Sequence, residues 1–79
     1  MRLDKYLKVS RVIKRRTVAN EACDAGRVMI NDKVARASAE VKAGDVITVS
    51  FGNREMKFRV LNVSETVRKE EAEGMYELL

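Results

Sequence analysis

Three basic residues stand side by side in this chain, at Lys14-Arg15-Arg16, and seven more Lys and Arg residues lie within the first 36 positions. Residues 1–36 carry ten basic and four acidic residues, whereas residues 37–79 carry six basic and eight acidic ones. Guanidinium groups donate paired hydrogen bonds to phosphate oxygens, and ammonium groups add compact positive charge. This asymmetry predicts that the N-terminal half binds a polyanion, and phosphate backbones are the commonest polyanions that a small basic domain meets.

The residue types that catalysis requires are scarce. The chain has no histidine and a single cysteine, Cys23, so neither an internal disulfide nor a zinc site with Cys and His ligands can form. The usual general base near neutral pH is missing, and no P-loop is present. We therefore expect no catalytic residue, no metal site and no cofactor. Cys23 lies in a helical pattern beside Ala19 and Ala22 and is expected in the core rather than as a reactive thiol.

Two short helices must hold the basic residues. Apolar residues from Leu3 to Ile13 recur at the spacing of one helix face. Residues 12–16 are expected to connect this helix to a second one over residues 17–25, after which Gly26 suits a left-handed C-terminal position. Positive charge at the start of the second helix opposes its dipole, which destabilises that helix slightly unless an anion neutralises the charge.

The pattern changes to short strands after the second helix. Residues 28–30 predict a strand, Asn31-Asp32 a turn, and Val34 the start of a return strand. Alternating apolar residues on either side of Gly52-Asn53 predict a β-hairpin over residues 46–60. Together these signals indicate an α+β fold.

One small domain is expected from 79 residues. We assign residues 1–64 to a single RNA-binding domain with its core motif in residues 1–50, and residues 65–79 to a charged C-terminal helix or tail with Met75 and Tyr76 pinned to the sheet. Apolar runs are too short to cross a bilayer and the N-terminus lacks the apolar region of a signal peptide, so we expect a cytoplasmic location and no membrane partner.

An ordered set of residues carries a family resemblance. It comprises Met1-Arg2-Leu3-Asp4-Lys5 with Leu7, then Thr17 and Ala19, Gly26-Arg27-Val28, Ile30-Asn31, Val41, Gly44-Asp45, Ile47 and Val49. Over about residues 1–50 this set resembles the RNA-binding domain first recognised in small-subunit ribosomal protein four, the S-four domain. The length, the basic triplet and the tail Lys69-Glu70-Glu71-Ala72 with Met75-Tyr76 extend the likeness to the small stand-alone bacterial factors of the RqcP group, in the heat shock protein fifteen family.

The resemblance implies an αL-type fold, in which two N-terminal helices pack on a small twisted antiparallel sheet. It also implies binding of structured RNA by a basic face made from both helices. For this group it implies a monomer that binds large-subunit ribosomal RNA and peptidyl-tRNA on obstructed large ribosomal subunits. There it supports tail elongation of stalled nascent chains alongside a ribosome-associated tail-adding factor that recruits tRNA.

The resemblance places RNA contacts at seven basic residues. These are Arg2, Lys8, Arg11, Lys14, Arg15, Arg16 and Arg27. Asp4, Thr17 and Gly26 are expected as structural support. Asp4 either caps the first helix or orients Arg2 through a salt bridge, and Thr17 joins the neighbouring arginines in a phosphate cradle at the start of the second helix. Many relatives have a small hydroxyl residue where this chain has Arg15, so this charge either strengthens phosphate binding or weakens the helix start.

Several alternatives remain at this point. Tyr6 either stacks on a base or packs with a wet tip. Asn31 and Lys33 either reach RNA or serve as a turn residue and a solvated lysine. Three function classes compete: a non-catalytic RNA-binding factor, a protein-interaction module whose basic face docks an acidic partner, and an enzyme or a domain detached from one. We favour the first and disfavour the third, because the sequence ends without a catalytic segment.

Overall fold

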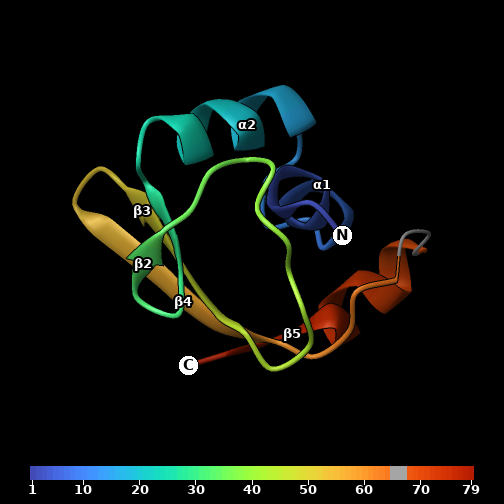
Figure 1. The fold of residues 1–79 in the computed structure, drawn as a ribbon. Coiled ribbons are helices and arrows are strands. Elements are labelled where there is room, and N and C mark those ends of the chain that lie inside the picture. The colour runs from blue at the N-terminus through green and yellow to red at the C-terminus, as the bar shows by residue number, and fades with distance from the viewer. Residues whose placement is uncertain (65–67) are drawn as a thin grey trace.

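The computed structural model describes residues 1–64 and 68–79 (Figure 1). Its elements, in chain order, are α1 (Leu3–Val9), α2 (Arg16–Asp24), β1 (Val28–Ile30), β2 (Lys33–Val34), β3 (Val46–Phe51), β4 (Arg54–Val60), the 3-10 helix η1 (Lys69–Met75) and β5 (Tyr76–Leu78). The strands form one antiparallel sheet in the order β2-β1-β3-β4-β5. Two helices therefore precede a small antiparallel sheet, and the predicted α+β fold is confirmed.

The β3–β4 hairpin follows the alternation that the sequence predicted. Its register places Val49 opposite Met56 and Phe51 opposite Arg54, and Gly52 takes the positive φ of 57° that the tight turn needs. Ile47, Val49, Phe58 and Val60 are buried, as period-two burial requires, but Phe51 at the end of β3 is exposed.

The turn between β1 and β2 is built from two left-handed residues, Asn31 (φ 52°) and Asp32 (φ 67°). Positive φ at both central positions is the geometry of a type I′ turn, which matches the twist of the flanking strands. The Asn31 side chain accepts a hydrogen bond from the Val46 amide (3.0 Å) and donates one to Asp45 (3.2 Å). Asn31 is therefore a turn residue, while Lys33 beside it is exposed.

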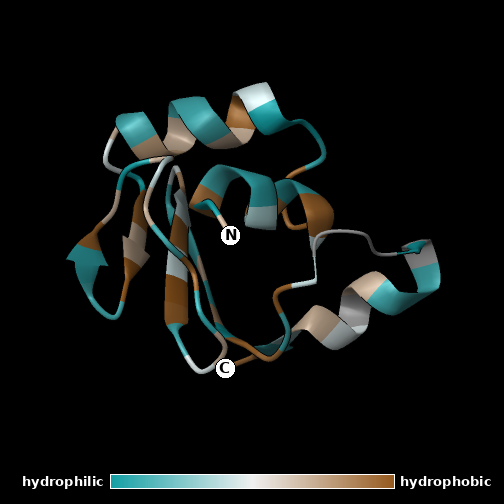
Figure 2. Cartoon of the chain, turned by 45° about the vertical axis from the view of Figure 1, so that its right-hand side comes forward, coloured by the Kyte–Doolittle hydropathy of each residue, from teal (hydrophilic) through white to brown (hydrophobic). Residues whose placement is uncertain are grey.

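One hydrophobic core joins the helices to the sheet. Leu3 and Leu7 from α1, and Ala19 and Cys23 from α2, are buried against strand residues such as Val28. Figure 2 shows brown, hydrophobic stretches in the helices and strands, and a teal, hydrophilic connection entering α2. The prediction that Cys23 belongs to the core is confirmed. Burial, with smaller contributions from nearby carboxylates, raises the pKa of its thiol to about 11, so the thiol is neutral near pH 7.

The C-terminal segment contributes a fifth strand that the sequence analysis did not predict. Met75 is buried in the core, and Tyr76 pairs with Val60 while its ring lies 5.2 Å from that of Phe58. The expected pinning of Met75 and Tyr76 to the sheet is confirmed. Strand β5 has only three residues and follows a charged run, so it shows no clear alternation. The division of the chain at residue 64 stays a prediction.

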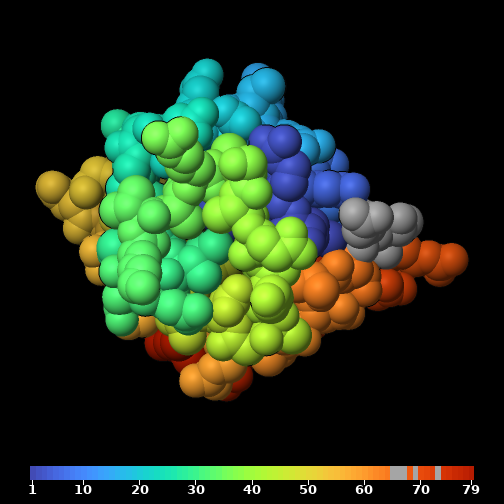
Figure 3. Space-filling view, in the orientation of Figure 1, coloured from blue at the N-terminus to red at the C-terminus, as the bar shows by residue number. Residues whose placement is uncertain are grey.

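A long loop links β2 to β3 and passes against the start of α1. The amides of Leu3 and Asp4 donate hydrogen bonds to the carbonyl oxygens of Ala39 (2.8 Å) and Ala37 (3.2 Å). The gap that the ribbon leaves in Figure 1 is filled by side chains in the space-filling view of Figure 3. No helix among the described residues combines the length and the apolar character needed to cross a membrane.

Candidate nucleic-acid interface

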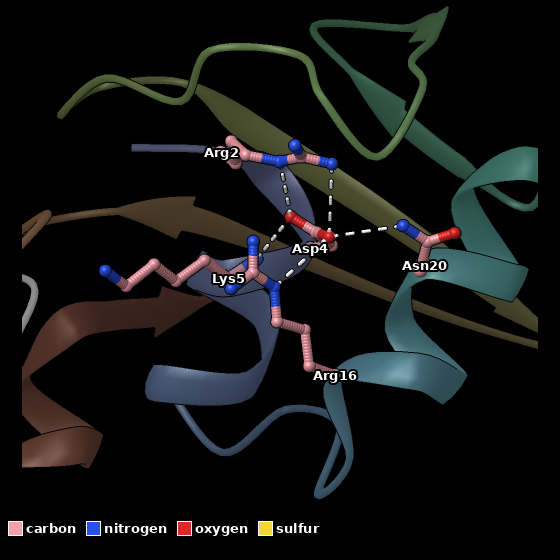
Figure 4. Close-up of polar contacts among 5 residues, drawn as sticks. All are labelled: Arg2, Asp4, Lys5, Arg16 and Asn20. Carbon is pink, nitrogen blue, oxygen red and sulfur yellow. Dashed lines mark hydrogen bonds and ion pairs between the residues drawn. The ribbon is translucent and has the colours of Figure 1, made fainter.

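A buried carboxylate lies at the centre of the basic half. Asp4, in the first turn of α1, is 2% exposed. It accepts hydrogen bonds from Nε of Arg2 (3.2 Å), Nε of Arg16 (3.3 Å), the side-chain amide of Asn20 (3.3 Å) and the backbone amide of Lys5 (2.8 Å). Figure 4 shows these donors converging on it from both helices. Asp4 therefore ties α1 to α2 and fixes two arginines at the surface.

Local sequence explains how each partner reaches Asp4. Arg2 is the residue before α1, in an extended conformation (φ −66°, ψ 146°), and its backbone pairs with Glu40 of the β2–β3 loop. Arg16 and Asn20 are four residues apart on α2, so they share one face of that helix. Of the two roles expected for Asp4, the salt bridge to Arg2 is confirmed. The N-cap residue is Arg2 and not Asp4, but Asp4 lies in the first turn, where its carboxylate accepts a hydrogen bond from the Lys5 amide (2.8 Å).

The hydrogen bonds decide the charge state of Asp4. Burial by itself would raise the pKa of this carboxyl, but the bonds from Asn20, Arg16 and the Lys5 amide outweigh it and hold the pKa below its ordinary value. Asp4 is thus ionised near neutral pH. Two guanidinium groups face one carboxylate, so the arginine cluster of Arg2, Asp4 and Arg16 has a net positive charge.

The two arginines are held without being buried. The side chains of Arg2 and Arg16 are 50% and 48% exposed. A guanidinium has five N–H donors, and only Nε of Arg16 bonds Asp4, so its terminal nitrogens have no partner within residues 1–64 and 68–79. Arg16 lies at the edge of a hollow of about 390 Å³, which is lined by Asp4, Arg16, Thr17, Asn20 and Glu21. This arrangement can bind an anion with pre-positioned donors.

The start of α2 offers a second attraction for anions. Arg15 is its N-cap residue in an extended conformation (φ −120°, ψ 132°), with no capping side chain and no acidic residue in the first turn. The dipole and the first amides of α2 therefore favour a negative group. The expected position of Arg15 as the N-cap of α2 is confirmed, and exposed Thr17 lines the adjacent hollow.

The remaining basic positions differ in how close they lie to the cluster. Lys8 stands in the last turn of α1, Arg11 follows that helix and Lys14 precedes α2; all three are exposed. Arg27 lies beyond the other end of α2, a helix that rises about 12 Å from Arg16 to Asp24 at 1.5 Å per residue. The structure brings together Arg2 and Arg16, places Lys14 and Arg15 on the same connection, and separates Arg27. RNA contact at all seven positions stays a prediction.

The structure also tests the expectations for Gly26 and Tyr6. Gly26 has a φ of 76° after the end of α2, as the left-handed position requires. Base stacking by Tyr6 is wrong, because the side chain is fully buried and its hydroxyl donates a hydrogen bond to the Met75 carbonyl (2.8 Å). Tyr6 is therefore a packed core residue, as the alternative expected, but its hydroxyl bonds to the protein and not to solvent.

Sequence reasoning missed Asn20 and the β2–β3 loop. Asn20 could have been found from its four-residue spacing to Arg16, which puts both on one helix face. The loop brings the backbone of Ala37 and Ala39 to the start of α1, as the bonds from the Asp4 and Leu3 amides show. No local pattern predicts these contacts, because their partners are more than thirty residues apart in the sequence.

Comparison with known proteins identifies the relatives of this chain. The S4 domain model matches residues 1–47. Proteins described as RQC P-site tRNA stabilizing factor are 54% identical in Halalkalibacterium halodurans over 99% of this chain and 89% of the relative, and 53% identical in Bacillus subtilis over 100% of this chain and 92% of the relative. The corresponding protein of Streptococcus pneumoniae is 49% identical over 100% of this chain and 90% of its own.

Two solved structures have the same fold. The trimeric structure of heat shock protein 15 from Vibrio cholerae superposes with a TM-score of 0.92 at 31% identity, covering 100% of this chain and 81% of that one. The solution structure of a hypothetical protein gives a TM-score of 0.84 at 31% identity, covering 100% and 96%. The resemblance seen in the sequence is confirmed.

Proposed function

The chain belongs to the S4 domain family, and from this premise we propose that it is a non-catalytic RNA-binding factor of ribosome-associated quality control. In this role it binds large-subunit ribosomal RNA and stabilises the peptidyl-tRNA in the P site of obstructed large ribosomal subunits. It thereby supports tail elongation of the stalled nascent chain. The similarity to relatives described as RQC P-site tRNA stabilizing factor, at about 50% identity over nearly the full chain, supports this assignment.

One observation carries the proposal at the level of atoms. Arg2 and Arg16 are fixed on the buried carboxylate of Asp4 while about half of each side chain stays exposed. Ordering a long side chain on binding costs about 0.5–1.5 kcal/mol of conformational entropy. Because Asp4 already orders both arginine side chains in the free protein, RNA binding loses less of this free energy. The uncapped start of α2 adds dipole attraction for a phosphate at the same place.

The proposal includes partners and location. The factor works as a monomer in the cytoplasm, without a cofactor, beside a ribosome-associated tail-adding factor that recruits tRNA. Equilibrium sedimentation tests the monomer, and co-purification of the tail-adding factor with large subunits that carry this protein tests the partnership.

Co-sedimentation with purified large ribosomal subunits tests the RNA-binding role. Arg2→Ala and Arg16→Ala should each weaken association at near-physiological salt, and the double variant should be weaker still. Arg59→Ala is the matched control, because Arg59 is 47% exposed on β4 and pairs with Glu77 rather than with the cluster. If the double variant associates with large subunits as the wild-type protein does, the proposed RNA-binding role is wrong.

A basic face that docks an acidic protein is the competing function. Titration with salt separates the two, since RNA binding should show a log–log slope of about −0.7 for each single-strand phosphate neutralised, and about −0.9 on duplex. Deproteinised large-subunit RNA should compete for the factor. Retained binding to whole subunits in the presence of excess RNA would favour the acidic partner instead.

A further inference from the structure

A second hollow, of about 280 Å³, lies on the other flank of α2. Its lining includes Val18, Glu21 and Ala22 from α2, Arg27 beyond that helix, and Ser50 and Phe51 at the end of β3. We propose that this hollow binds one unpaired nucleotide of the RNA, with the base stacked on Phe51 and the phosphate paired with Arg27. This inference rests on the proposed function, which it extends to a second contact on the same RNA.

Phe51 differs from the other aromatic residues of the chain. Tyr6 and Phe58 are buried in the core, and Tyr76 is partly covered against Phe58, but Phe51 is 46% exposed at the rim of the hollow. Every nucleobase has a π-face that stacks on an aromatic ring. A single exposed ring suits one splayed-out base, as in loops and bulges of folded RNA, rather than a run of stacked bases.

The polar groups around Phe51 match the remaining parts of a nucleotide. The backbone of Arg27 is fixed at both sides, since its amide bonds the Ala22 carbonyl (3.0 Å) and its carbonyl accepts the Ser50 amide (2.9 Å). Its exposed side chain therefore extends from a fixed backbone, and its guanidinium can pair with a phosphate. The Glu21 carboxylate, an acceptor only, can take hydrogen bonds from the amino edge of a base.

The second hollow is continuous with the arginine cluster. Glu21 lines both hollows, so the two adjoin along α2. An RNA bound at Arg16 and lying across α2 would reach Arg27 at the far end of that helix. This placement gives Arg27 a role in RNA binding although it stands apart from the other basic residues.

A nucleotide fits the hollow better than an apolar side chain of a protein. Val18 and Phe51, both 46% exposed, would pack on either occupant. An apolar side chain, however, would desolvate Arg27 and Glu21 without supplying hydrogen-bond partners, which is unfavourable. A nucleotide supplies a phosphate to the first and a donor edge to the second.

Binding of deproteinised large-subunit ribosomal RNA by Phe51→Leu and Phe51→Trp tests the inference. Leucine keeps an apolar surface but lacks the π-face, so F51L should lower RNA affinity about 5- to 150-fold, while F51W should keep it. The salt slope should stay unchanged in F51L, whereas Arg27→Gln should reduce it by about 0.7. Leu61→Ala is the control, since Leu61 is 48% exposed and lies beyond the opposite end of β4 from Arg54, the partner of Phe51.

The outcomes separate this inference from the function on which it rests. If the wild-type protein and F51L bind the RNA equally, the nucleotide site is overturned while the RNA-binding role stands. If F51L loses affinity for whole subunits but not for deproteinised RNA, a ribosomal protein occupies the hollow and the inference fails. If the wild-type protein binds neither and R16A changes nothing, the proposed function fails first.

Discussion

Oδ2 of Asp4 and Nε of Arg16, twelve positions apart in the sequence, lie 3.3 Å apart across the two helices. The pair joins the first turn of α1 to the first turn of α2. Asp4 also holds Arg2, so one buried carboxylate positions two arginines that converge from different segments. In Figure 4 the convergence is visible as bonds arriving from the start of α1 and from α2.

Asp4→Asn should weaken RNA binding although it makes the protein more positive. The variant loses the charge that orders both guanidinium groups, so these side chains must be ordered on binding, and we expect about a tenfold loss of affinity for large subunits. Stability should fall by about 1–2 kcal/mol, a figure reduced because the arginines are half exposed. Asp24→Asn is the control, since it changes charge equally at an exposed position of α2. Equal or tighter binding by D4N would show that total charge, not positioning, governs affinity.

Stability should fall in acid partly through Asp4. The pKa of this carboxyl is lower in the folded protein than its ordinary value of 3.8, so the unfolded chain takes up the proton first as pH falls. The stabilising contribution is complete above about pH 5 and is lost as pH drops below 4 through the folded-state pKa. Urea unfolding of wild-type and D4N proteins should therefore differ most near pH 7, and the difference should shrink as pH falls below 4. A difference that stays constant over this range would contradict the shifted pKa.

Arg11→Gly should stabilise the fold and weaken RNA binding at the same time. Arg11 follows α1 with a φ of 64°, a left-handed conformation that glycine adopts without strain. After allowing for the greater freedom of glycine in the unfolded chain, we expect a gain of about 0.5–1 kcal/mol in urea unfolding. Arg11→Lys, which keeps the charge, should leave both properties close to wild type. Unaltered RNA affinity in R11G would remove Arg11 from the interface.

Tyr6→Phe should affect stability but not RNA binding. The Tyr6 hydroxyl donates to the Met75 carbonyl at 2.8 Å, and that oxygen also accepts the amides of Leu61 (2.8 Å) and Asn62 (3.2 Å). Because the carbonyl keeps two partners, the loss should be about 0.5–1 kcal/mol in thermal or urea unfolding. Reduced RNA affinity in Y6F, with the fold intact, would reopen a direct contact at this residue.

Local patterns in the sequence were enough for most elements. The apolar spacing that begins at Leu3 and the small residues of α2 predicted two helices, and the alternation around Gly52-Asn53 predicted the hairpin. The assignment of Val12 and Ile13 to the first helix face is wrong, because α1 ends at Val9 and both residues lie on the connection to α2. These signals succeed because they depend on neighbours within one or two turns, or on the two-residue period of a strand. Strand β5 was not predicted, because its three residues are positioned by pairing with β4 and show no sequence pattern of their own.

The sequence by itself determined that the basic charge is concentrated in the first 36 residues, that three basic residues stand side by side before the second helix, and that no histidine is available for catalysis or metal binding. Only the tertiary structure decided that Arg2 and Arg16 share Asp4, that Arg27 joins Phe51 on the other flank of α2, and that Tyr6 is closed off from any base. The physical reason is that these contacts join residues distant in the chain. Their geometry follows from how α1, α2 and the sheet pack, which periodicity does not specify.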